Sequence, residues 1–132
     1  MSQVFSGDAV NNVVSTTLVT TAETPCATSN FLSPPFGNAK ALVFGSVNVA
    51  TGVGANTIVV RLRRNPNAEN LQLGIQINVT AAASAGYILP IMIADAIPDG
   101  RPVQYAVTIQ QLGATGNGSV SFASVSAILI SG

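Results

Sequence analysis

Three arginines are the side chains whose type and spacing come closest to a functional site. Arg61, Arg63 and Arg64 form the densest cluster of charge in a chain of 132 residues. Guanidinium groups bind carboxylates and phosphates, so the cluster could hold an anion or the acidic side chains of a partner. The alternative is a solvated strand face whose charges pair with Glu69 or a nearby aspartate. We predict a polar contact surface for a partner protein at these three arginines and keep the alternative open.

The other reactive residue types do not assemble into a catalytic set. The sequence has no histidine, which excludes a Ser-His-Asp triad and the usual zinc sites. Cys26 has no histidine to activate it, and we expect a small buried residue. Asp95 and Asp99 flank a turn and could act as acid and base or bind calcium, but their spacing fits no calcium loop. Asp8 and Glu23 are isolated in the sequence. We therefore predict a protein that is not an enzyme and binds no metal or cofactor.

The low charge content indicates a protein that partners cover. Only 8% of the residues are charged and the formal net charge is zero, whereas about 25% is usual in soluble proteins. Few charges leave a free monomer poorly protected against association. We expect a homo-oligomer, with a trimer favoured, and a merely neutral soluble domain is the alternative. A neutral chain also lacks the basic footprint of a nucleic-acid-binding protein.

The length favours one domain, and we expect an N-terminal arm at residues 1–8 followed by the folded domain at residues 9–132. The first residues lack the basic and apolar regions of a signal peptide, so synthesis in a host cytoplasm is expected. No apolar run approaches the length of a membrane span, and we expect no membrane partner. Asn78 and Asn117 lie in glycosylation sequons, which matter only in a eukaryotic secretory route.

Alternation of apolar and polar residues predicts about eight strands and no helix. The cleanest alternation is in Leu71–Thr80, where five aliphatic residues including Ile75 share one face. In the last strand the alternation changes phase, which predicts a bulge near Ala123–Ser124 or burial of both faces. Gly45 indicates a bulge or a close approach of the backbone. The predicted strands are Ala9–Ala22, Ala27–Ser33, Lys40–Ala50, Thr57–Arg64, Leu71–Thr80, Tyr87–Ala94, Pro102–Gln111 and Gly118–Ile130.

One predicted strand, Tyr87–Ala94, is apolar on both faces. It contains Pro90, which favours a sheet edge or a bulge. An apolar edge strand is a candidate subunit interface, and we predict an apolar contact at Tyr87, Ile91 and Ile93. The alternative is a central strand with both faces covered.

The connection at residues 24–38 is rich in proline and breaks the strand pattern. Phe31 and Phe36 lie within it. We expect both rings to anchor this long connection to the core.

Eight antiparallel strands in one domain predict two packed sheets. The expected fold class is therefore all-β, a single-domain antiparallel β-sandwich with jelly-roll topology. An immunoglobulin-like sandwich is the alternative, although its Cys…Trp…Cys pattern is absent.

Three segments resemble small all-β virion proteins of tailed bacteriophages: STTLVTTAET near the start, TIVVRLRRN in the middle and VQYAVTIQQLGATGNGSVSFASVSAIL at the end. The resemblance implies a jelly-roll-like structural protein, such as a capsid decoration protein or another head or tail component. It implies a location in the virion and contacts with other virion proteins. No functional residue of such proteins can be assigned to a position here.

These observations lead to two hypotheses for the function. The first is an oligomeric bacteriophage structural protein that binds neighbouring virion subunits. The alternative is a receptor- or carbohydrate-binding head module of a tail fibre or spike, with a host glycan as partner. Sugar sites commonly stack sugar rings on Trp or Tyr. This chain has no Trp and only Tyr87 and Tyr105, and the alternation places Tyr105 in the core.

Overall fold

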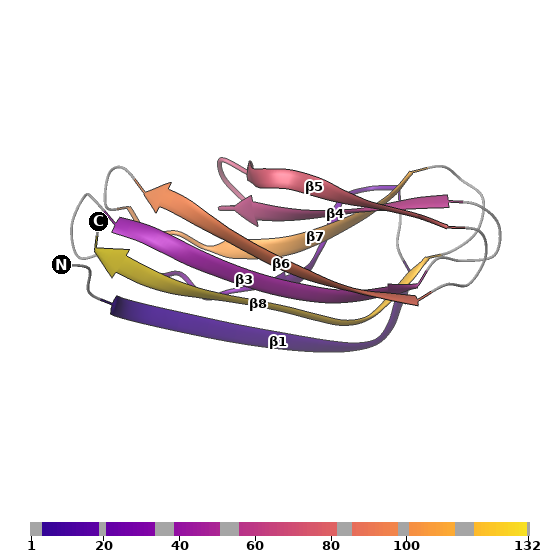
Figure 1. Ribbon diagram of the computed structural model, residues 1–132, viewed down its shortest axis with the longest axis horizontal. Coiled ribbons are helices and arrows are strands. Elements are labelled where there is room, and N and C mark those ends of the chain that lie inside the picture. The colour runs from indigo at the N-terminus through magenta and orange to yellow at the C-terminus, as the bar shows by residue number, and fades with distance from the viewer. Residues whose placement is uncertain are drawn as a thin grey trace.

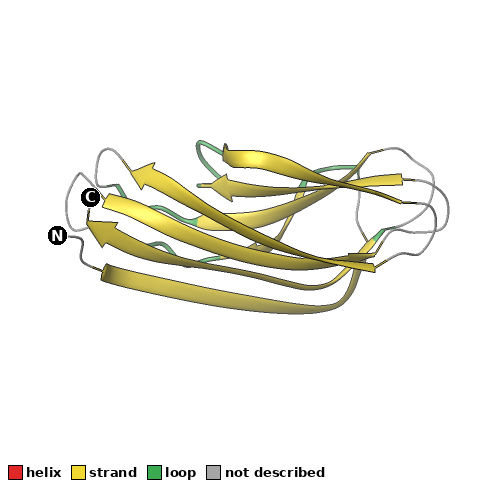
Figure 2. Cartoon of the chain, viewed as in Figure 1, coloured by secondary structure: helices red, strands yellow, loops and turns green. Residues whose placement is uncertain are grey.

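A computed structural model shows two antiparallel sheets packed face to face (Figures 1 and 2). It describes residues 4–18, 21–33, 39–50, 56–81, 86–97, 101–112 and 118–131. These residues contain no helix, and none of them forms a helical segment that could span a membrane. The strands are β1 (Val4–Leu18), β2 (Thr24–Thr28), β3 (Ala39–Ala50), β4 (Asn56–Arg64), β5 (Leu71–Ala81), β6 (Gly86–Ile97), β7 (Tyr105–Leu112) and β8 (Ser119–Ser131).

The strand pairing is nested, which confirms the predicted jelly roll. β1 pairs with β8, β2 with β7, β3 with β6 and β4 with β5. Two further pairings, β3 with β8 and β4 with β7, complete the sheets. The resulting orders are β1-β8-β3-β6 and β2-β7-β4-β5, so each sheet combines strands that lie far apart in the sequence.

The core lies between the two sheets and consists largely of valine, isoleucine and leucine. Alternate residues of β3, β7 and β8 point inward, as the period-2 pattern predicts. Gly45 lies where the two sheets come close together: a Cβ there would be 2.9 Å from Val107 Cγ2. Pairing runs through Gly45 without a register shift, so this glycine marks a close approach and not a bulge.

The predicted bulge in the last strand is present, slightly earlier than expected. Phe122 pairs with Asn48 and Val120 pairs with Val49, which leaves Ser121 as an extra residue. Val120 is buried before the bulge, and Ala123 is buried after it. The extra residue therefore causes the change of phase seen in the sequence.

The expected N-terminal arm is wrong from Val4 onward. Val4 pairs with Ile130 and Asp8 with Ala127, so these residues belong to β1. The reason is that β8 extends to Ser131 and offers hydrogen-bonding groups along its whole length. Residues 1–3 lie outside the described part of the chain.

The single apolar face expected for β5 is also wrong. Val60 pairs with Ile77 and Leu62 pairs with Leu73, so β5 contains extra residues at this point. Gly74 has a φ of 67°, a conformation that favours glycine. The bulge turns Ile75 outward, where its side chain is 92% exposed. Leu73 before the bulge and Val79 after it are buried, whereas Leu71 at the start of the strand is 43% exposed.

Candidate functional site

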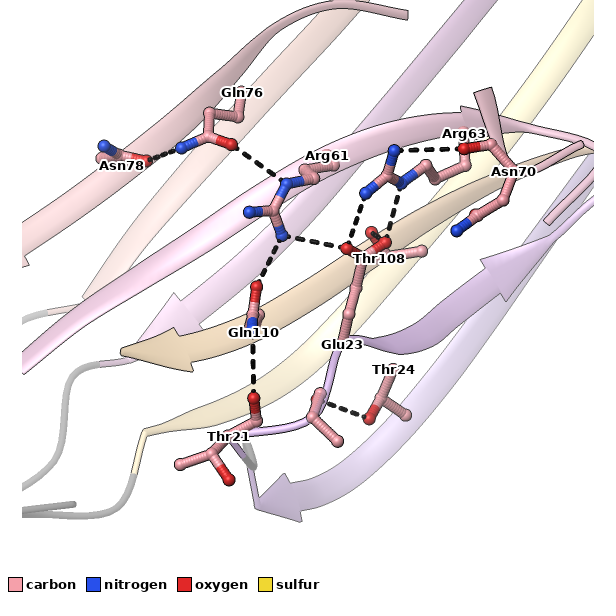
Figure 3. A network of polar contacts seen from close by, with 11 residues as sticks. Thr21, Glu23, Thr24, Arg61, Arg63, Asn70, Gln76, Asn78, Thr108 and Gln110 are labelled. Carbon is pink, nitrogen blue, oxygen red and sulfur yellow. Dashed lines mark hydrogen bonds and ion pairs between the residues drawn. The ribbon is translucent and has the colours of Figure 1, made fainter. Parts of the chain in front are cut away.

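The outer face of the β2-β7-β4-β5 sheet carries a network of polar side chains centred on Glu23 (Figure 3). Glu23 directly precedes β2, and Arg61 and Arg63 alternate along β4. The Glu23 carboxylate accepts hydrogen bonds from Arg61 Nη1 at 3.0 Å and from Arg63 Nη2 at 2.8 Å. Arg63 Nε and Thr108 Oγ1 each donate to its second oxygen at 2.8 Å. One carboxylate thus joins β4, β7 and the start of β2.

These contacts determine the charge of Glu23. Hydrogen bonds from Arg63 lower the pKa of Glu23 from 4.5 to about 2, against an opposing effect of burial. The same pairing raises the pKa of Arg63. Two guanidinium groups share this one carboxylate, so the network of Arg61, Arg63 and Glu23 has a surplus of one positive charge.

Amide side chains extend the network to the sheet edges. Arg61 Nε donates to Gln76 Oε1 at 3.0 Å, and Arg61 Nη1 donates to Gln110 Oε1 at 2.8 Å. Gln76 then donates to Asn78 Oδ1 at 3.2 Å, and Gln110 donates to the Thr21 carbonyl at 3.1 Å. The network therefore joins β5, β4 and β7 to the residues that lead into β2, as Figure 3 shows. Its internal pairing matches the alternative interpretation of the arginines as a paired strand face.

Arg64 belongs to a different cluster, which links the two sheets. It is the last residue of β4, and its Nη1 lies 2.8 Å from Asp95 Oδ1 on β6 of the other sheet. Its Nε lies 2.7 Å from Glu69 Oε1. Asp95 is only 6% exposed and also accepts a hydrogen bond from Tyr105 at 2.8 Å. Burial and the charge of Asp95 raise the pKa of Tyr105.

The structure divides the three arginines between two clusters, and their partner contact stays a prediction. Arg61 and Arg63 bind Glu23 on one face of the sheet, whereas Arg64 binds Glu69 and Asp95. Glu23 is not isolated, because β2 lies beside β7 and β7 lies beside β4. No local spacing could indicate this, since Glu23 and Arg61 are far apart in the sequence. Asp99, the suggested partner of Asp95, lies outside the described residues.

Cys26 is buried, as expected, and its thiol donates to the Val107 carbonyl at 3.3 Å. Burial raises its pKa to about 12, which disfavours the reactive thiolate. Within the described ranges, no group of three or more His, Cys, Asp or Glu side chains could hold a metal ion.

The predicted apolar contact lies on an edge strand, because β6 is the outermost strand of its sheet. Ile91 and Ile93 are partly buried and pack against the core. Met92, between them, is 72% exposed, and Pro90 is exposed as well. Tyr87 pairs with Val49 through its backbone, while its side chain lies outside what is described.

β5 is the outermost strand of the other sheet, and it runs beside β6 on the same side of the sandwich (Figure 1). A Cβ on Gly74 would lie 2.5 Å from Ile93 Cδ1, so the two edges touch. We call this surface the β5–β6 side and define it by Ile75, Ile77, Pro90, Ile91, Met92 and Ile93.

A groove of about 530 Å³ opens at the end of the sandwich where β4 ends and β5 begins. Apolar groups make up most of its lining, and Phe31 stands at its edge with 62% of the residue exposed. The expected core anchoring by Phe31 is therefore wrong: the neighbouring Leu32 is buried instead. Phe36 lies outside the described residues. The other lining residues are Asn65, Asn67, Ala68, Glu69, Arg101, Pro102 and Gln104.

No known protein family matches this sequence. No curated protein matches it either.

Solved structures do match the fold. The structure of infectious bursal disease virus strain Gx aligns with a TM-score of 0.55 and 8% identity over 98% of this chain and 37% of that chain. The crystal structure of the T13 infectious bursal disease virus particle aligns with a TM-score of 0.55 and 8% identity over 98% of this chain and 35% of that chain. The Gt strain structure gives a TM-score of 0.52 and 9% identity over 94% and 37% of the two chains. These similarities establish a shared all-β fold, and this chain spans little more than a third of those chains.

Proposed function

We propose that this protein is a virion structural protein that associates with copies of itself and with neighbouring virion subunits. Its fold is shared with chains of virus particles along almost its whole length. A likeness at 8% identity concerns the fold, so the proposal rests on surface properties as well.

The β5–β6 side is the observation that carries the proposal. Edge strands usually carry charges that prevent association. The sequence of β5 contains no charged residue, and that of β6 contains only Asp95, which is buried and paired with Arg64. In their place the edges present Ile75 and Met92, both largely exposed. An uncharged apolar surface of this kind fits a second surface of the same character, as a neighbouring copy would offer.

The edge of the sandwich that contains the β5–β6 side is large enough for a stable contact. Strands of 11 and 12 residues extend about 36–40 Å at roughly 3.3 Å per residue. With two sheets about 10 Å apart and their side chains, the whole edge formed by β5 and β6, with the β5–β6 side in its middle, covers roughly 700 Å². Specific interfaces bury about 800 Å² per partner. One such contact could therefore hold two subunits together.

The finer assignment follows the sequence resemblance: a bacteriophage capsid decoration protein or another head or tail component, made in the host cytoplasm, with a trimer as the favoured oligomer. The proposal includes no enzymatic activity, cofactor, nucleic-acid partner or membrane partner. The alternative is a glycan-binding head module, and the exposed Phe31 beside the groove is the observation that favours it.

The test is the absolute mass in solution, measured by light scattering coupled to size exclusion over a range of concentrations. We expect a stable oligomer for the natural chain and a loss of mass for Met92→Lys, because a charge would be buried in the contact. Leu112→Lys is the matched control, since Leu112 is an exposed apolar residue on β7, in the interior of the other sheet. A monomer at high concentration, with no affinity for virion subunits, would contradict the proposal.

A further inference from the structure

Phe31 is an exposed ring on a backbone that is held in place. Leu32 N donates to the Val103 carbonyl at 2.8 Å, and Val103 N donates back to the Leu32 carbonyl at 2.9 Å. On the other side, Ser29 N donates to the Tyr105 carbonyl at 2.8 Å. The chain is thus tied to β7 and the residues before it on both sides of Phe31. Exposed aromatic rings on ordered backbone are typical anchors of protein interfaces.

The lining of the groove includes Asn65, whose backbone and side chain are held by hydrogen bonds. Asn65 is buried and has a φ of 48°. Its N–H donates to the Gln104 carbonyl at 2.7 Å, and its Oδ1 accepts from Gln104 N at 2.9 Å. Its carbonyl accepts from the amides of Ala68 and Asn70. A binding partner would therefore find the groove already shaped, which reduces the entropy lost on binding.

The polar groups in the groove are largely engaged within the chain. Glu69 accepts from Arg64 and from Asn65 Nδ2, and the Gln104 amide donates to the Ser29 carbonyl at 2.9 Å. A sugar would need hydrogen bonds for its hydroxyl groups, and leaving them unmade weakens binding. The apolar lining instead fits an apolar side chain. Glu69 and Arg101 balance each other on the rim, so the rim does not select an acidic or a basic partner.

This surface carries both parts of a contact: an apolar groove and, among the residues that line it, Phe31 with most of its surface exposed. Two copies related by a two-fold axis can each place the ring in the groove of the other, because such interfaces pair a surface with itself. We propose that Phe31 of one copy enters the groove of a second copy in this reciprocal way. The inference rests on the proposed structural function. It adds a second contact surface, separate from the β5–β6 side. An assembly with two kinds of interface needs two such surfaces on each subunit.

Fluorescence can test the contact directly, because the chain contains no tryptophan. In Phe31→Trp, we expect the emission to move to shorter wavelength as the concentration rises and the ring becomes buried. Adding Ala68→Arg to this variant fills the groove. The midpoint of the emission shift should then move to at least about tenfold higher protein concentration. Leu112→Trp, at the opposite end of β7, is the control and should show no shift.

Light scattering on the same samples separates the outcomes. If the protein is oligomeric and the emission of Phe31→Trp stays at the long wavelength of a solvent-exposed indole at every concentration, the groove is empty in the assembly and this inference is overturned, while the proposed function stands. If mono- or oligosaccharides shift the emission of the dilute variant, the occupant is a sugar and the inference is also overturned. A monomer at every concentration overturns this inference, and if that monomer also has no affinity for virion subunits, it overturns the proposed function as well.

A second variant keeps the test independent of the introduced indole. Phe31→Lys should raise the dissociation constant at least about tenfold in light scattering, since the charge would enter an apolar groove. An unchanged constant overturns the inference. Circular dichroism melting confirms that each variant is folded before it is compared.

Discussion

Glu23 is the residue on which the outer face of the β2-β7-β4-β5 sheet depends. Its carboxylate accepts four hydrogen bonds from three side chains. Without it, Arg61 and Arg63 would face each other with like charges in a partly buried setting. The sequence predicts that these two arginines contact a partner, and any partner would meet them as part of this network.

The lowered pKa of Glu23 predicts a dependence of stability on pH. The carboxylate titrates at about 2 in the folded chain and near 4.5 when unfolded. Its contribution is therefore complete above pH 4.5 and is lost as the pH falls toward 2. We expect it to be on the order of 1–2 kcal/mol after allowance for solvent screening.

Urea unfolding of the natural chain and of Glu23→Gln measures this contribution. The difference in the free energy of unfolding should be largest near pH 6 and should shrink toward pH 2.5. Thr24→Ala, at the adjacent partly buried position, should give a small difference that does not vary with pH. A difference for Glu23→Gln that stays constant across this range would refute the assigned role.

At the scale of elements, Gly45 in β3 shows how closely the two sheets pack. A methyl group there would press on Val107 Cγ2 at 2.9 Å and lie 3.4 Å from the Ser124 carbonyl oxygen. We expect Gly45→Ala to destabilise the fold by about 1–3 kcal/mol, the usual effect of overpacking a core.

Thermal and chemical unfolding can check this expectation. Lys40→Ala, on the same strand at an exposed position, is the control and should change stability by less than about 0.5 kcal/mol. If Gly45→Ala is as stable as the natural chain, the sheets can separate at this point at little cost.

Most strands could be predicted from the sequence because their apolar and polar residues alternate. The predicted strand Ala27–Ser33 is largely wrong, because β2 runs from Thr24 to Thr28 and includes Pro25 at the edge of its sheet. The edge position of the strand with Pro90 and the extra residue in β8 also left local signals. The exposure of Ile75 left no local signal, because the alternation of residue types continues through the bulge at Gly74. The exposure of Phe31 left none either, since Leu32 takes the inward position and pairs with Val103, far along the chain. The partner of Arg61 depends on which strands are neighbours, and only the fold determines that.

For the whole molecule, two kinds of contact surface compete as explanations of its association. The β5–β6 side has exposed apolar groups and no exposed charge among its six defining residues. The Arg61–Arg63–Glu23 network has a surplus positive charge. Salt separates the two, because it screens contacts between charges and leaves apolar contacts intact.

We therefore expect the dissociation constant for self-association to change by less than about twofold between roughly 0.05 and 0.5 M sodium chloride, and sulfate to strengthen association. Sedimentation equilibrium at several salt concentrations provides the measurement. Arg61→Gln should leave the constant unchanged. Dissociation by sodium chloride would instead assign the contact to the arginines.

The position of β8 has a consequence for how the molecule forms. This strand lies between β1 and β3, so the last strand along the chain occupies the middle of its sheet. Neither neighbour has its full set of hydrogen bonds until β8 arrives, and β1 pairs with no other strand within the described residues. A ribosome-bound chain that ends before Ser119 would thus expose two unpaired strand edges. Folding dominated by such distant pairings is slow, and the nascent chain must stay unassembled until its final strand has been made.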